Sequence, residues 1–133
     1  MKKRPYLVLL VIGIILIGII YTLSYPSGSF YKEEFELATG EQLPNSAKLI
    51  EGYSEWGMSC AIFEISIDQW EEFTILLLNR ANRDRSRPES FNPELLKSLG
   101  SDADIFALTT KRRFVFVGLN ESSRQIFYEV WHN

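Results

Sequence analysis

The chain has 133 residues, a formal net charge of −3 at pH 7, and 46% hydrophobic and 23% charged residues. One cysteine cannot form an internal disulfide, and one cysteine with one histidine offers zinc too few ligands, so we expect no metal and no cofactor. Beyond position 23 the net charge is −6, which argues against nonspecific nucleic-acid binding.

The first predicted element is a membrane-spanning helix. Three basic residues, Lys2, Lys3 and Arg4, precede an uncharged apolar run over residues 6–23. At about 1.5 Å per residue this run reaches about 27 Å, close to the hydrocarbon thickness of a bilayer. The positive-inside rule keeps the basic residues in the cytoplasm and places the rest of the chain outside. We therefore expect residues 1–23 to be the transmembrane signal-anchor of a single-pass cell-membrane protein.

A cleavable signal peptide is the alternative, because it also has a basic start and an apolar core. The apolar run is longer than usual and lacks an Ala-x-Ala ending, which favours an anchor over cleavage near residues 27–29. The remainder of the chain is exported in either case. We expect residues 24–29 to form a short tether and residues 30–133 to form one small exported domain.

A short helix and two strands are expected at the start of this domain. Residues 32–39 are predicted to be helical, because Gly40 just past them is a preferred helix stop. Residues 47–55 alternate loosely, break at positions 56–57, and are followed by a period-two pattern over residues 58–66. We expect these two strands to form a hairpin.

The clearest helix start lies at Ser66. A serine at the cap and Gln69 three residues later can satisfy each other's free backbone amides, which is the pattern of a capping box. Apolar residues then recur at three- and four-residue intervals, at Ile67, Trp70, Phe73, Leu76 and Leu77. We expect a helix over residues 67–81 that packs on the sheet through this stripe.

A shorter helix and three strands complete the predicted domain. Asn92 and Pro93 supply a cap and a first helical position, and Gly100 supplies a stop. Three alternating segments follow, over residues 103–110, 114–119 and 124–131. The predicted fold is α+β: an antiparallel sheet of about five strands, a hairpin plus a three-stranded meander, with one main helix packed on one face and a single N-terminal transmembrane helix before it.

Two basic segments supply the candidate binding residues. They are Arg83, Arg85 and Arg87 in the loop between the predicted helices, and Lys111, Arg112 and Arg113 between the first two meander strands. If the segments lie together, they form a positive rim that could meet lipid headgroups or an acidic partner. The alternative is solvated and screened surface charge.

No catalytic constellation emerges from the sequence. A nucleophilic pair of Cys60 and His132 requires the last strand to lie beside the second one. Glu64 and Asp68 could form an acid pair, although acids at a helix start also complement the helix dipole. The triplet at residues 120–122 matches a glycosylation acceptor, and we interpret it as a turn.

These features predict a membrane-anchored, non-enzymatic binding or accessory module that acts by protein contacts on the extracytoplasmic face. Its expected partners are the lipid bilayer and an envelope protein. The alternatives are a small secreted or membrane-tethered enzyme with an unrecognised site, and a subunit of a membrane complex in which the span supplies the interface. The sequence leaves the oligomeric state open.

Overall fold

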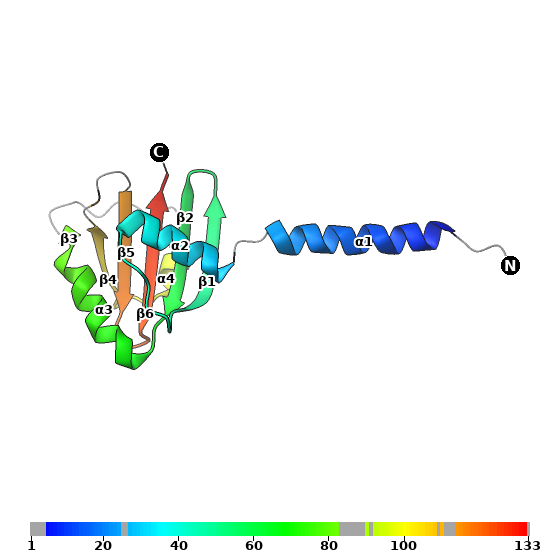
Figure 1. Cartoon of the computed structure of the whole chain (residues 1–133). Coiled ribbons are helices and arrows are strands. Elements are labelled where there is room, and N and C mark those ends of the chain that lie inside the picture. The colour runs from blue at the N-terminus through cyan, green and yellow to red at the C-terminus, as the bar shows by residue number, and fades with distance from the viewer. Residues whose placement is uncertain are drawn as a thin grey trace.

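Helix α1 (Pro5–Ser24) stands apart from the packed domain in Figure 1. The computed structural model describes residues 5–24, 27–82, 90, 92–108, 110 and 114–132. The most apolar stretch of 18 residues in this helix has a mean hydropathy of 2.8, so the helix is long and apolar enough to cross a membrane. None of that stretch is buried against the rest of the protein. The basic residues expected to orient it, Lys2, Lys3 and Arg4, lie outside the described residues.

Helix α2 (Gly28–Thr39) ends at Gly40, as the sequence predicted. Gly40 has a φ of 75°, and its N–H donates to a carbonyl of the last turn at 2.7 Å. This left-handed cap is the one that glycine favours. The helix begins four residues earlier than predicted, because Tyr31, one turn before Phe35, is buried on the same helix face.

The strands form one sheet in the order β1-β2-β6-β5-β4-β3, with every neighbouring pair antiparallel. The strands are β1 (Lys48–Glu55), β2 (Met58–Glu64), β3 (Ala81–Asn82), β4 (Asp104–Leu108), β5 (Phe114–Asn120) and β6 (Gln125–Trp131). The predicted hairpin is confirmed as β1–β2 and the predicted meander as β4–β5–β6. Strand β3 adds two residues beside β4, and the pairing of β2 with β6 joins hairpin and meander.

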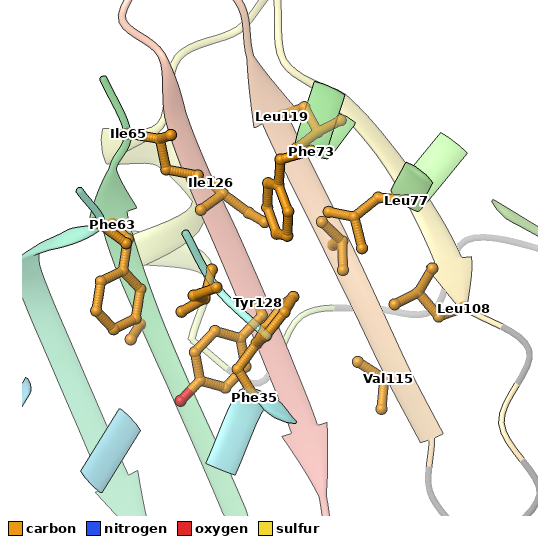
Figure 2. Close-up of a cluster of buried hydrophobic side chains, with 14 of the residues drawn as sticks. Phe35, Phe63, Ile65, Phe73, Leu77, Leu108, Val115, Leu119, Ile126 and Tyr128 are labelled. Atoms are coloured by element: carbon orange, nitrogen blue, oxygen red, sulfur yellow. The ribbon is translucent and has the colours of Figure 1, made fainter. Parts of the chain in front are cut away.

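Helices α2 and α3 (Ile67–Asn79) lie over one face of the sheet (Figure 1). In Figure 2, Phe35 of α2 lies beside Tyr128 of β6, and Phe73 and Leu77 of α3 lie over the neighbouring strands. The Phe35 and Tyr128 rings meet edge to face, with centroids 5.4 Å apart. The main apolar core is therefore on this face, where the buried side chains of both helices meet those of the central strands.

The opposite face of the sheet is buried as well, which corrects the prediction of one helix covering one face. Helix α4 (Pro93–Ser98) covers this second face (Figure 1). A separate apolar cluster fills it, made of Met58, Cys60, Ile62, Leu95, Leu99, Phe116 and Phe127. The period-two alternation predicted for β2 is right, but both of its faces carry apolar side chains and both become core.

The two later helices begin where the sequence predicted, one of them through a different contact. At α4, Pro93 takes the first position and the N–H of Leu95 donates to Oδ1 of Asn92 at 3.0 Å. At α3 the predicted capping box is not formed. Oε1 of Gln69 accepts instead from the N–H of Ser46 at 3.1 Å, which ties the helix start to the turn before β1.

Candidate docking groove beside helix α3

Helix α3 leaves part of its apolar surface uncovered. Trp70, Phe73 and Leu77 are buried, as the predicted stripe requires. The exposed fractions are 75% for Ile67, 52% for Ile75, 40% for Leu76 and 36% for Leu78. The stripe prediction is therefore wrong for Ile67 and Leu76. Trp70, Phe73 and Leu77 pack into the core beneath the helix, whereas the four exposed side chains are left at its surface.

An open groove of about 710 Å³ runs along this uncovered surface. Residues that recur every three or four positions form its helical wall: Ile67, Trp70, Glu71, Thr74, Ile75 and Leu78. From the first to the last of them the helix rises about 16 Å. The groove follows nearly the whole of α3 and is about twice as large as the hollow of about 360 Å³ beside α4.

The opposite wall comes from the start of β4 and the end of β5. Asp104 of β4 pairs with Leu119 of β5, and both line the groove. Asp102 precedes β4, and Glu121 follows β5. With Ser122, five residues that are distant from α3 in sequence line this wall, and three of them are acidic.

Asn120 holds this wall in place. Its Nδ2 donates to the carbonyl oxygen of Leu99 at 2.6 Å and to Oδ1 of Asp102 at 3.2 Å, and its Oδ1 accepts from the N–H of Ser123 at 3.1 Å. The side chain is buried, so its amide is used within the fold. The hydrogen bond from Ser123 agrees with the interpretation of residues 120–122 as a turn. The hydrogen bond to Asp102 holds that carboxylate in the wall of the groove.

Every charged residue that lines the groove is acidic. These residues are Glu71, Asp102, Asp104 and Glu121. The apolar lining of the same groove comes from Ile67, Trp70, Ile75, Leu78 and Leu119. Carboxylates of one sign beside an apolar surface create a negative potential that attracts cationic groups and disfavours anionic ones. The groove thus combines apolar contact area with electrostatic selectivity.

The predicted basic rim, Arg83, Arg85, Arg87, Lys111, Arg112 and Arg113, lies outside the described residues. Its described neighbours converge on one place in the sheet. Ser90 Oγ donates to Oε2 of Glu129 at 2.7 Å, and Nε1 of Trp131 donates to Oε1 of the same carboxylate at 2.9 Å. Phe114 pairs with Trp131 across β5 and β6. Ser90 and Phe114, which follow the two basic segments in the chain, therefore lie beside Glu129 and Trp131.

The two reactive pairs considered from the sequence have no catalytic geometry. Although β2 pairs with β6, Cys60 lies in the second-face cluster, whereas the His132 ring contacts α2 on the first face. Burial, and then the charge of Glu129, raises the pKa of Cys60 to about 12, so its thiol is protonated near neutral pH. Hydrogen bonding to Ser66 and to the backbone lowers the pKa of Asp68, which suits a helix-start carboxylate.

A glutamate, a histidine and a serine meet at the end of β6, a contact that the sequence did not indicate. Nε2 of His132 lies 2.9 Å from Oε2 of Glu34 and 3.4 Å from Oγ of Ser59. A catalytic triad requires one ring nitrogen for the serine and the other for the acid. Here the same nitrogen faces both, and Ser59 is only 2% exposed. The cluster therefore lacks the arrangement of a triad, and it brings the end of β6 beside α2.

Among the residues that the structure describes, no group of three or more His, Cys, Asp or Glu side chains could hold a metal ion. Comparison with protein-family models, with curated proteins and with solved structures finds no match. The groove beside α3 combines apolar and charged groups along nearly the whole helix, and it is the candidate functional site.

Proposed function

We propose that this chain is a membrane-anchored, non-enzymatic binding module whose domain acts through protein contacts on the extracytoplasmic face of the cell membrane. The carrying observation is an uncovered apolar helix α1 attached to a domain with an uncovered, acid-lined groove. Lipid would cover the first of these surfaces, and a polypeptide partner would cover the second.

Several features of α1 support a membrane span. Its 20 residues rise about 30 Å, the thickness of the hydrocarbon core. Tyr6 and Tyr21 lie near its two ends, where interfacial aromatic residues are enriched. The hydroxyl of Thr22 donates to the carbonyl oxygen of Gly18 at 2.8 Å, so this polar group is satisfied within the helix. The basic residues at positions 2–4 support a cytoplasmic N-terminus.

The chemistry of the groove supports an envelope protein as the domain's partner. Anionic headgroups would be repelled by its four carboxylates, which argues against lipid as the occupant. A polypeptide can present apolar and cationic side chains together, as the groove requires. The enzyme alternative has weaker support. Ser59 is buried, and His132 uses the same ring nitrogen, Nε2, toward both Glu34 and Ser59.

Crosslinking of the full-length chain in its native membrane tests this proposal. Mass spectrometry would identify the captured protein and the N-terminal residue of the chain itself. We expect a specific envelope protein, captured by a chain that retains residues 1–23. Absence of any partner, together with a new N-terminus near residue 30, would contradict the proposal and indicate a secreted domain.

An exchange of the anchor separates this proposal from the membrane-complex alternative. Residues 6–23 would be replaced by an unrelated apolar span of equal length, and the capture experiment repeated. A passive anchor tolerates the exchange, so capture of the same partner is expected. Loss of the partner with normal membrane insertion would favour the alternative, in which the span supplies the interface.

A further inference from the structure

We propose that the groove beside α3 binds a short cationic amphipathic helix of a partner protein. This inference rests on the proposed function and adds to it the location of the contact and the chemistry of the partner. The shape of the groove, its apolar lining and the sign of its charges support such an occupant.

The shape of the groove favours a helical occupant. Ile67, Ile75 and Leu78 of α3 line it along a rise of about 16 Å, which is the length of about three helical turns. An amphipathic helix laid beside α3 can place apolar residues, spaced three and four apart, against side chains spaced in the same way. The exposed apolar side chains Ile67, Ile75 and Leu78 all lie along one side of one helix, unlike scattered exposed residues.

The charges of the groove favour a cationic occupant. Glu71 stands on the helical wall of the groove, and Asp102, Asp104 and Glu121 stand on the opposite wall. Lysine and arginine can lay their methylene stems on an apolar surface while their charged ends reach a rim of carboxylates. A helix with an apolar stripe flanked by Lys and Arg meets both requirements, whereas an acidic helix would be repelled.

Binding of a defined peptide to the full chain tests the inference. The probe is a fluorescent amphipathic peptide of about four turns, made of Leu and Lys, with a Leu and Glu peptide of the same pattern as its control. The chain is held in nanodiscs of zwitterionic lipid, and association and dissociation rates are measured. Every variant carries the same α1 and the same lipid, so partitioning of the peptide into lipid is common to all.

A matched pair of charge reversals isolates the acidic wall. Glu71 and Glu72 are neighbours on α3 and both are exposed, but only Glu71 lines the groove. We expect Glu71→Lys to slow association of the cationic peptide by about fivefold at low salt, with a smaller effect at high salt. Glu72→Lys should change the rate by less than about twofold. Equal effects of the two reversals would overturn the inference.

A second matched pair isolates the apolar contact. Ile75 and Leu76 are both exposed, at 52% and 40%, but only Ile75 lines the groove. We expect Ile75→Gln to weaken peptide binding by about tenfold through faster dissociation. Leu76→Gln should leave binding unchanged within about twofold. Absence of binding to the unmodified chain, or equal binding of the acidic peptide, would also overturn the inference.

Photo-crosslinking in the native membrane separates this inference from the proposed function. A benzoylphenylalanine is placed at Ile75 in the groove or at Trp56, which is fully exposed at the β1–β2 turn. Capture at position 75, within a basic amphipathic segment of the partner, supports the inference. Capture only at position 56 overturns the inference and leaves the proposed function standing. Capture at neither position contradicts both.

Discussion

Nε2 of His132 lies 2.9 Å from Oε2 of Glu34, which joins the residue after β6 to the first helix of the domain. A second contact joins the same elements, because the hydroxyl of Tyr128 donates to the carbonyl oxygen of Tyr31 at 2.8 Å. Helix α2 follows α1 in the chain, so these contacts fasten the part of the domain nearest α1 in the chain to β6, a central strand of the sheet.

Replacement of Tyr128 by Phe should lower the free energy of unfolding by about 1 kcal/mol. The ring would remain in the core beside Phe35, but its buried hydrogen bond to α2 would be lost. Denaturant unfolding of the full chain, followed by tryptophan fluorescence, measures the change. Tyr53→Phe, at an exposed position of β1, is the control and should have little effect. Equal destabilisation by both variants would contradict this role for Tyr128.

Gly52→Ala should destabilise the domain by about 1–3 kcal/mol, because an added methyl group would overlap the Tyr31 ring. That ring is buried between α2 and β1 and has little room to move. Gly28→Ala is the control, since its methyl group would meet Cβ of Leu49 at an ordinary 3.5 Å. In the double variant with Tyr31→Ala, the cost of Gly52→Ala should largely disappear. Additive effects of the two substitutions would contradict a direct clash.

Alkaline pH should destabilise the folded domain through Cys60. Burial and the neighbouring Glu129 raise the pKa of its thiol from about 9 to about 12. Above pH 9 the unfolded chain therefore releases this proton first, and the folded state becomes less stable as the pH rises towards 12. Unfolding measured at several pH values should show this fall.

Cys60→Ala is the control for this pH dependence. It removes the titrating thiol, so the stability of the variant should fall less steeply than that of the unmodified chain between pH 9 and 12. Thiol reagents should modify Cys60 slowly in the native chain and rapidly after unfolding. Parallel pH profiles for the two chains would show that Cys60 does not contribute.

Asn120→Ala should lower the free energy of unfolding by about 1–3 kcal/mol, because it removes three hydrogen bonds of a buried amide. The substitution also leaves the carbonyl oxygen of Leu99 without this donor. Asn45→Ala, at an exposed turn residue, is the control and should change stability by less than about 0.5 kcal/mol. Similar losses in both variants would argue against a special role for Asn120.

Much of the fold could be predicted because it depends on neighbouring residues. Gly40 ends α2, Asn92 and Pro93 start α4, and short turns connect β1 to β2 and β5 to β6. The candidate groove could not be predicted, because it joins α3 to residues 102–122, which lie far along the chain. One signal in the sequence could have indicated the groove. Helix α3 has more apolar residues than the predicted stripe uses, and two of the extra ones, Ile75 and Leu78, are exposed.

The sequence by itself determined the apolar helix, the class of the domain and the ends of most elements, since spacing and capping act within a few residues. Only the tertiary structure decided that β2 pairs with β6, that both sheet faces are buried, and that acids from separate turns face the exposed side of α3. These features depend on which distant segments pack together, and many alternative pairings share the same local patterns.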